Sequence, residues 1–354
     1  MIHRGPDPKG PARCATATLA PVPLQRIPRV LTASSLDIAT LGGRTMGTTW
    51  SVKLAVGRSR DLHPLHAGIQ ACLDRVVAQM STWEPDSDIS RYNRAAAGRW
   101  LPLPREFFAV LQAAQAIAGR SAGAFDPTVG PLVELWGFGA SPHPQRVPAA
   151  AEIAAVAQRV GWRRIALRDE DREALQPGGL QLDLSGIAKG YGVDLAAACL
   201  RESGIDAALV EVGGELYGYG RKPDGTPWRV LVESTPEEDD ACGLPPRVLA
   251  LDGIAVATSG DRWHRFDAGG QRYSHTFDPR QGRPVPGAAA AVTVIADDAM
   301  HADGWATALT VMGVHEGLAL AEREDLAVRF LARGGDGLQE TLSTAFRRRL
   351  EATA

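Results

Sequence analysis

An alternating apolar segment that runs directly into a helix pattern, near the middle of the chain, constrains the fold more than any other feature. Apolar residues alternate over Leu180–Leu184, which predicts a β-strand, and Gly186–Ser203 has the spacing of a helix. Ser185 stands between the two segments and is a residue type that caps helix starts. Free backbone N–H groups at a helix start with little side-chain bulk bind phosphate or carboxylate groups, so this junction predicts an anion-binding site.

Two charged residues flank this junction. Asp183 ends the predicted strand, and Lys189 follows in the first turn of the predicted helix. The chain has only four lysines among its 38 lysines and arginines, so a lysine at this place indicates a need for a compact positive charge. Each residue also has a plainer interpretation. An acid here can simply bond to the amides of a turn, and a helix lysine can simply be solvated.

A second acid stands near the start of another predicted helix, Ala299–Met312. Asp303 and Thr307 are four residues apart, so they share one helix face, beside the small Gly304 and Ala306. A carboxylate and a hydroxyl one turn apart suit Mg²⁺, which takes few protein oxygens and completes its octahedron with water and phosphate oxygens. The alternative is an acid favoured by the helix dipole and a threonine bonded to its own helix, and the spacing alone favours that alternative.

Together these segments supply a phosphate-binding helix start, a lysine and two acids, a set that suits Mg²⁺-assisted chemistry on a phosphate ester. His275, at the end of a predicted strand, is a candidate general base, although a histidine in this position is more often structural. The glycines of Gly213–Gly220 resemble a dinucleotide-binding loop only loosely. They lack its strand, GxGxxG and helix context, so we interpret them as strand-edge turns.

The bulk composition excludes several classes of protein. The chain has 354 residues, of which 45% are hydrophobic and 22% charged, and this is typical of an ordinary globular protein. Its net charge of −3 gives no reason to expect nucleic-acid binding. Its four cysteines are far apart and form no CxxC pair, so a zinc site is not expected. No run is long and apolar enough to span a membrane.

The first residues differ from the rest of the chain. Residues 1–41 contain many prolines and scattered arginines but no continuous apolar stretch, so we expect a disordered or mis-assigned leader followed by one domain over 42–348. Cys14 follows Gly-Pro-Ala-Arg rather than an apolar run, which does not support a lipid anchor. With neither a signal peptide nor an anchor visible, the sequence alone predicts a cytoplasmic protein.

The remaining pattern predicts an α+β fold with mixed or antiparallel sheets and packed helices. Strands are predicted at 50–56, 164–167, 207–212, 228–232, 254–258, 272–277, 290–295 and 327–331. Helices are predicted at 69–80, 105–118, 150–160, 186–203 and 299–312, with a short one after 314. The acidic, proline-bearing residues 236–246 predict a solvated loop. Because strands outnumber helices and do not alternate strictly with them, a doubly wound parallel sheet is not favoured.

Eleven short segments, in this order, resemble the FAD:protein FMN transferase family, also called the ApbE family. They are Thr45–Thr48, Met80–Trp83, Asp88–Asn93, Gly123–Asp126, Val129–Leu132, Leu135–Gly139, Leu182–Gly190, Val212–Glu215, Ala257–Gly260, Ser274–Pro279 and Ala302–Ala308. No single segment is specific, but their occurrence together over nearly the whole chain after residue 42 is.

The resemblance implies an enzyme that cleaves the pyrophosphate of its substrate FAD with Mg²⁺, attaches FMN through a phosphoester to a threonine or serine of a target protein, and releases AMP. The implied target is a flavoprotein, such as a redox-driven pump subunit or a flavin-domain reductase. The residues implied to contact FAD are Met46, Trp83, Ala124, Phe125, Asp126, Asp183, Lys189, His275 and Thr276. The implied metal ligands are Gly186 and Ala306, through their carbonyls, with Asp303 and Thr307. His275 is the first candidate for the catalytic base, and Asp303 is the second.

Three alternatives stay open beside a flavin transferase. An FAD pyrophosphatase would use water as the nucleophile in the same site. An FAD-binding or storage protein would not turn over, and Asp303, Thr307 and His275 argue against it. A redox flavoenzyme would need a second-substrate motif, which is not visible. The resemblance also implies that relatives often act in the periplasm or anchored to the inner membrane, unlike the location predicted from this sequence.

Overall fold

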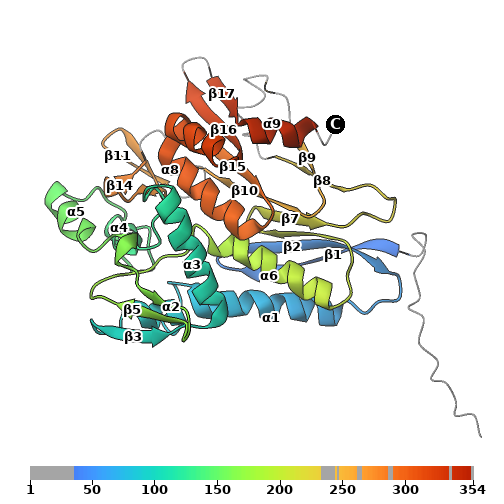
Figure 1. The fold of residues 1–354 in the computed structure, drawn as a ribbon, viewed down its shortest axis with the longest axis horizontal. Helices are drawn as coiled ribbons and strands as arrows, with labels where there is room; N and C mark the ends of the chain where they lie inside the picture. The colour runs from blue at the N-terminus through green and yellow to red at the C-terminus, as the bar shows by residue number, and fades with distance from the viewer. Residues whose placement is uncertain are drawn as a thin grey trace, which may run out of the picture.

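An antiparallel sheet forms the centre of the molecule (Figure 1). The computed structural model describes residues 36–232, 244, 247–260, 265–285, 290–334 and 337–351. Within this part the largest sheet has eight strands in the order β1-β2-β6-β7-β10-β15-β16-β17, and every neighbouring pair is antiparallel. They are β1 (Leu36–Thr45), β2 (Thr48–Gly57), β6 (Ala208–Val212), β7 (Glu215–Tyr219), β10 (Ile254–Ser259), β15 (Ala291–Ala296), β16 (Ala327–Gly334) and β17 (Gly337–Leu342).

Smaller sheets and several helices surround this centre. The small sheets pair β3 (Arg99–Pro102) and β4 (Leu167–Arg168) with β5 (Glu173–Gln176), β8 (Trp228–Leu231) with β9 (Val248–Leu251), β11 (Arg265–Ala268) with β12 (Gln271–Ser274), and β13 (Phe277–Asp278) with β14 (Arg283–Pro284). The helices are α1 (His63–Met80), α2 (Asp88–Asn93), α3 (Arg105–Arg120), α4 (Gly130–Leu135), α5 (Ala150–Ala157), α6 (Ala188–Glu202), α8 (Ala299–Arg323) and α9 (Thr344–Glu351). The predicted α+β fold is confirmed.

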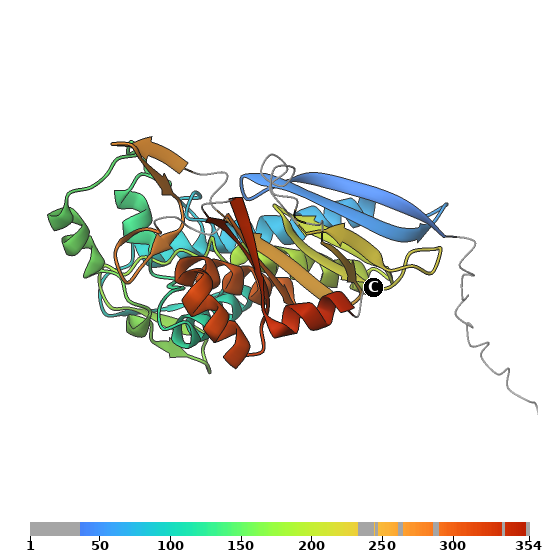
Figure 2. The same cartoon turned by 90° about the horizontal axis from the view of Figure 1, so that it is seen from above.

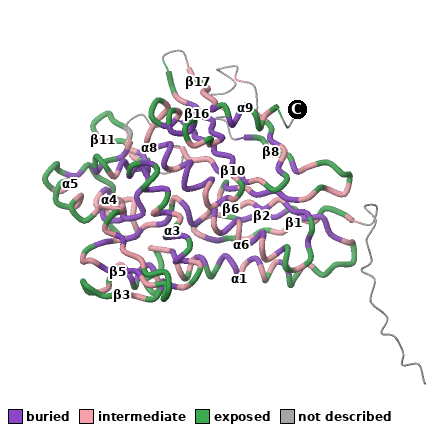
Figure 3. Tube along the Cα trace, viewed as in Figure 1, coloured by how far each residue is buried: buried purple, intermediate pink, exposed green. Residues whose placement is uncertain are grey.

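Both faces of the large sheet are packed. The long helices α1, α6 and α8 cover one face, and the β8–β9 hairpin with α9 covers part of the other (Figures 1 and 2). Val294 belongs to the core under the helices, whereas its neighbour Ile295 joins Trp228 and Phe346 on the opposite side. Successive side chains of a strand point to opposite faces, so strands covered on both sides are apolar throughout. Figure 3 shows the buried trace following these central strands and the exposed trace at peripheral α5 and β3.

The predicted strand at Leu180–Leu184 is wrong, although its leucines are buried. Its partner is a side chain rather than a strand. The amide of Asn93 accepts a hydrogen bond from the Leu182 N–H (2.7 Å) and donates to the Leu182 carbonyl (2.9 Å). The Asp183 N–H donates to the carbonyl of Pro127 (2.8 Å). The apolar alternation predicted the burial of the leucines correctly, but it could not show which groups form hydrogen bonds with the backbone of this segment.

The prediction that Ser185 caps the following helix is also wrong. The helix α6 begins at Ala188, and its N-cap residue is Ile187, which provides no side-chain cap. Ser185 instead donates its backbone N–H to Asp183 Oδ1 (2.8 Å). The serine therefore belongs to a turn that precedes the helix, and Gly186 lies in the same turn, outside the helix.

Several predicted boundaries differ for local reasons. β1 begins at Leu36 rather than near Gly42, because it pairs with β2 along its whole length despite a polar, glycine-containing sequence. The predicted strand 272–277 is divided between β12 and β13, around His275. The predicted strand 164–167 is a 3₁₀ turn (Trp162–Arg164) followed by β4. The predicted strand-edge turn at Gly213–Gly220 contains a strand, β7. Residues 1–35 and, apart from 244, the predicted loop 236–246 lie outside the described residues.

The predicted break between two helices after Met312 is confirmed. α8 contains Gly313 with φ 71° and ψ 179°, which is a non-helical conformation. The first part of α8 carries Asp303 and Thr307. No helix within the described ranges combines the length and the apolar character needed to cross a membrane.

Two carboxylates fix the N-terminus of α8. Asp298 is its N-cap residue, and Oδ1 of Asp298 accepts the N–H of His301 (2.8 Å). Asp194, from α6, accepts the N–H of Ala299 (2.8 Å) and of Met300 (2.9 Å). Three of the four N–H groups left free at a helix start are therefore bonded, and one of the two acids ties α8 to α6.

We expect Asp194→Ala to lower the free energy of unfolding by about 1–2 kcal/mol, because two helix N–H groups lose their acceptor. Chemical denaturation measures this loss. The control is Asp86→Ala, at an exposed position, which should change stability by less than about 0.5 kcal/mol. Equal effects of the two substitutions would contradict the proposed anchoring of α8.

Candidate functional site

Two tight hairpin turns lie side by side at one end of the large sheet. The β1–β2 turn contains Met46 (φ 49°) and Gly47 (φ 71°), and the β6–β7 turn contains Gly213 (φ 60°) and Gly214 (φ 105°). Positive φ at both central residues is the geometry that a two-residue hairpin turn favours. The Gly213 N–H donates to the carbonyl of Thr49 (3.0 Å), so one turn is bonded to the start of the neighbouring strand.

The start of α6 and the first part of α8 meet these turns in a buried cluster of charges. Nζ of Lys189, in α6, donates to Oε1 of Glu215 (2.7 Å) and lies 3.6 Å from Oδ1 of Asp303. Glu215 is the first residue of β7, and its side chain and that of Asp303 are 3% and 2% exposed. Oδ2 of Asp303 accepts the backbone N–H of Gly190 (3.0 Å). Three segments distant in sequence thus place one ammonium group between two carboxylates.

The electrostatics of this cluster favour a charged lysine. Burial alone would lower the pKa of Lys189, but the carboxylates of Asp303 and Glu215 outweigh burial, so the pKa is raised above its ordinary value. Burial raises the pKa of Glu215, and the ammonium of Lys189 opposes that rise. The cluster therefore holds a permanent positive charge against carboxylates removed from water.

Oxygen atoms gather next to this charge cluster. The hydroxyl of Thr307 lies 3.3 Å from the carbonyl oxygen of Gly186 and 3.4 Å from the hydroxyl of Ser259, at the end of β10. A Cβ on Gly186 would stand 3.0 Å from Oγ1 of Thr307 and 3.3 Å from a ring carbon of Phe125. The close packing explains why this position is a glycine, and it brings Gly186, Thr307 and Phe125 together.

The carbonyl of Ala306 is differently placed. It accepts the hydroxyl of Thr310 (2.8 Å), and within a helix it also faces the N–H four residues later. Both of its lone pairs therefore have donors in its own helix. The carbonyl of Gly186 and the hydroxyl of Thr307 face each other, whereas Ala306 contributes its small side chain to the buried core.

Two other residues expected to bind FAD contact α6 or the turn before it. Met46 packs against α6, where its terminal methyl carbon lies 3.0 Å from the place that a Cβ on Gly192 would occupy. Asp183 is half-buried before the turn, and one of its oxygens accepts the N–H of Ser185. The plainer interpretation of Asp183, a carboxylate bonded to turn amides, is thus confirmed for that oxygen.

The remaining predicted residues lie on separate segments. Asp126 is buried, and its carboxylate accepts the N–H and hydroxyl of Thr128 (2.8 and 2.6 Å) and the N–H of Trp162 (3.0 Å). Burial raises the pKa of Asp126 despite these bonds. This acid therefore organises the loop that carries Phe125 and the buried Ala124.

Two of the predicted site residues with ring side chains are open to solvent. Trp83 is 64% exposed in the turn after α1. His275 is exposed between β12 and β13, and the following Thr276 is buried. Phe277 packs edge-on against Trp136, which anchors this segment to the body of the protein.

The structure adds two residues that had no predicted role. Glu215 bonds to Lys189, and Ser259 lies beside Thr307. Both residues were within motifs that carried the family resemblance, Val212–Glu215 and Ala257–Gly260, so a signal existed. Spacing along the chain could not connect them to Lys189 or Thr307, because the contacts arise from sheet pairing.

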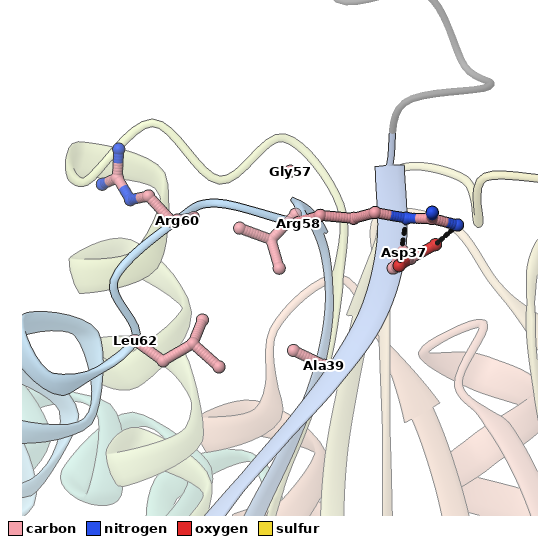
Figure 4. Close-up of a pocket in the computed structure, with 7 residues that line it drawn as sticks. Asp37, Ala39, Gly57, Arg58, Arg60 and Leu62 are labelled. Atoms are coloured by element: carbon pink, nitrogen blue, oxygen red, sulfur yellow. Dashed lines mark hydrogen bonds and ion pairs between the residues drawn. The ribbon is translucent and has the colours of Figure 1, made fainter.

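A shallow cavity of about 450 Å³ lies away from these residues, between the β1–β2 pair and the start of α1 (Figure 4). The ion pair between Arg58 Nε and Asp37 Oδ2 (2.8 Å) lies at its edge. None of the predicted site residues lines it. The charge cluster around Lys189, rather than this cavity, is the candidate active site.

Comparison with known proteins identifies the family of this chain. Residues 46–330 match the model of the ApbE family. The chain belongs to that family. It is 37% identical over 308 residues to an FAD:protein FMN transferase of Vibrio cholerae, covering 87% of this chain and 91% of that protein. It is 31% identical over 323 residues to one of Escherichia coli, covering 90% and 91%.

Solved structures show the same relationship. The flavinyl transferase ApbE of Pseudomonas stutzeri, in its apo form, superimposes with a TM-score of 0.82 at 39% identity, covering 90% of this chain and 98% of that one. The flavin transferase ApbE of Vibrio cholerae gives a TM-score of 0.81 at 35% identity, covering 89% and 99%. The predicted family is therefore confirmed.

We expect Lys189→Met to lower the free energy of unfolding by about 3 kcal/mol, because it leaves two buried carboxylates without a cation. Adding Glu215→Gln should recover part of the loss, since one of those carboxylates is then neutral. Chemical denaturation of both variants tests this.

The control for this prediction is Lys222→Met. The side chain of Lys222 is similarly exposed (27%, against 30% for Lys189), but its acidic neighbour Asp224 is 3.8 Å away and 62% exposed. We expect a change of less than about 1 kcal/mol there. A loss for Lys189→Met no larger than that for Lys222→Met would show that the buried charge cluster is not coupled as described.

Proposed function

We propose that this protein is an Mg²⁺-dependent FAD:protein FMN transferase. It cleaves the pyrophosphate of FAD, joins the FMN phosphate to a threonine or serine hydroxyl of another protein, and releases AMP. Family membership supports the flavin-transfer reaction. The observation that carries the proposal is the contact between the Gly186 carbonyl and the Thr307 hydroxyl, one helical turn from Asp303, whose carboxylate lies 3.6 Å from the ammonium of Lys189.

The residues at this point fit a hard divalent cation. The donors are a carbonyl, a carboxylate and a hydroxyl, which are the oxygen ligands that Mg²⁺ prefers. Among the described residues, no three histidine, cysteine, aspartate or glutamate side chains cluster in the manner of a metal site. The site therefore depends on Asp303 with Gly186 and Thr307, and the carbonyl of Ala306, also implied by the resemblance, supports them least. When bound, Mg²⁺ neutralises charge on the pyrophosphate oxygens.

The side chains of the chain supply binding, orientation and proton transfer. Lys189 provides a fixed positive charge next to the phosphates, with Asp183 beside the turn that holds Gly186. Trp83 and Phe125 offer planar surface to the flavin or the adenine, and Met46, Ala124, Asp126 and Thr276 complete the proposed FAD contacts. Phosphoryl transfer depends mainly on such positioning and charge compensation.

His275 acts as the general base in this proposal. The acceptor hydroxyl forms a bond to the FMN phosphorus while the bond from that phosphorus to the AMP oxygen breaks. The hydroxyl proton passes to His275, and AMP leaves with the displaced oxygen. The exposed position of His275 suits a base that must reach a hydroxyl on another protein.

The alternative with water as nucleophile is an FAD pyrophosphatase in the same site. Incubation with FAD, Mg²⁺ and a flavoprotein domain carrying an acceptor threonine separates the two reactions. Mass spectrometry should find FMN on the acceptor in equal amount to AMP, and an excess of EDTA should abolish both. AMP with free FMN and an unlabelled acceptor would instead establish the hydrolase. Absence of AMP with Mg²⁺ or Mn²⁺ would contradict both enzymes.

Asp303→Asn should reduce metal-dependent turnover by about 100-fold or more. An amide keeps an oxygen to accept the N–H of Gly190, so the fold is retained, but the neutral amide is a weaker ligand for a divalent cation than a carboxylate. The Mg²⁺-induced rise in melting temperature should also disappear. Full turnover together with an unchanged thermal shift would remove Asp303 from the metal site.

His275→Ala should lower kcat by about 100-fold or more while FAD affinity changes less than about threefold, because a general base acts only in the transition state. Single-turnover rates and fluorescence titration with FAD measure the two effects. The reverse pattern, with FAD affinity lost and kcat kept, would make His275 a binding residue.

A further inference from the structure

The lysine in the charge cluster is not shared equally between its two carboxylates. Nζ of Lys189 is 2.7 Å from Oε1 of Glu215, a hydrogen bond, but 3.6 Å from Oδ1 of Asp303, beyond hydrogen-bond distance. The ammonium therefore leans toward Glu215. Asp303 interacts electrostatically with the ammonium but accepts no hydrogen bond from it.

The two oxygens of Asp303 have different surroundings. Oδ2 accepts the backbone N–H of Gly190 (3.0 Å), a contact fixed by the packing of α6 on α8. Oδ1 is the oxygen that faces Lys189. A cation at Asp303 and the ammonium of Lys189 therefore compete for the same carboxylate oxygen.

The position of Glu215 affects how closely the ammonium of Lys189 approaches Asp303. Its side chain is 3% exposed, and its second oxygen, Oε2, is buried and has no hydrogen-bond partner among the described residues. The ammonium of Lys189 is thus the donor that compensates this carboxylate. Cδ of Lys189 lies 3.3 Å from the place that a Cβ on Gly213 would occupy. The β6–β7 turn therefore restricts the conformations of the Lys189 side chain.

We propose that Glu215 is a positioning residue that holds Lys189 away from Asp303 and so keeps Oδ1 of Asp303 available to a divalent cation. Without the carboxylate at Glu215, the lysine turns to its remaining acidic neighbour and donates a direct hydrogen bond to Asp303. The cation must then displace that hydrogen-bonded ammonium. This inference rests on the metal proposed at Asp303.

The test measures metal binding without FAD and without turnover. Mn²⁺ is titrated into each variant, and free Mn²⁺ is followed by electron paramagnetic resonance. Glu215→Gln should weaken Mn²⁺ binding by about tenfold or more, as expected for loss of a residue that orients a metal ligand. Melting curves in EDTA establish that each variant is folded.

Two further variants separate positioning from a simple loss of negative charge. Glu215→Asp keeps the charge but shortens the side chain by one methylene, so it should also weaken Mn²⁺ binding. Lys189→Met combined with Glu215→Gln removes the competing ammonium and should restore binding to within about threefold of the unsubstituted protein. A structural role alone would not produce this recovery.

Kinetics provide a second readout. With Glu215→Gln, the Mg²⁺ concentration for half-maximal activity should rise about tenfold, while kcat at saturating Mg²⁺ stays near its original value, because enough cation displaces the lysine. A fall in kcat that saturating Mg²⁺ does not restore would contradict the proposal.

The outcomes also distinguish this inference from the metal site on which it rests. Asp303→Asn should abolish tight Mn²⁺ binding, and if it does not, the metal site itself is wrong. If Asp303→Asn abolishes binding but Glu215→Gln binds Mn²⁺ like the unsubstituted protein, only the role of Glu215 is overturned. Unchanged affinity in Glu215→Asp, beside a loss in Glu215→Gln, would likewise replace positioning by charge alone.

Discussion

The close approach of α6 and α8 at Gly190 is the constraint on which the candidate site depends. A Cβ at this position would stand 2.1 Å from the carbonyl oxygen of Ala299 and 2.8 Å from Cβ of Asp303, so no larger residue fits. Because the helices touch backbone to backbone here, the Gly190 N–H can bond to the carboxylate of Asp303. The same contact brings Lys189 and Thr307, each on a separate helix, to one end of the sheet.

Charge compensation explains why this contact can hold a functional site. Burying an ammonium group and two carboxylates is costly unless they are paired, and Lys189 pairs with both acids. Two carboxylates against one ammonium leave an excess of negative charge, which favours binding of a cation. In the proposed reaction, this excess would attract the divalent cation, and the bound cation would then compensate the charge of the FAD pyrophosphate.

The sequence predicted the elements whose side chains follow a regular period. β2, α3 and the first part of α8 have apolar residues at the strand or helix spacing, and each was found near its expected bounds. It failed at Leu180–Leu184 because the partner of that segment is the side chain of Asn93, which no periodicity reveals. The short β7 escaped notice because the glycines of its turn dominate its sequence.

The candidate site was also predicted only in part, because spacing along the chain relates residues within one helix but not residues on separate elements. Asp303 and Thr307 could be paired from the sequence, since four residues in a helix fix their relation. Lys189 could be grouped with them only by its chemistry and by the family resemblance, because no spacing along the chain shows that it contacts Asp303. Glu215 received no role, because its contact with Lys189 requires knowing that β7 lies over the start of α6, a relation set by the order of strands in the sheet.

The proposed site divides into a buried end and an exposed end, and this division matches the two halves of the proposed reaction. Asp303 and Glu215 are buried on a helix and at a strand start, and Gly186 lies in the turn that precedes α6. Such preorganised charges suit a pyrophosphate and a metal ion. Trp83 and His275 lie on peripheral segments and are open to solvent. A hydroxyl carried by a folded protein can reach only groups exposed in this way, so the exposed end is where the acceptor must arrive.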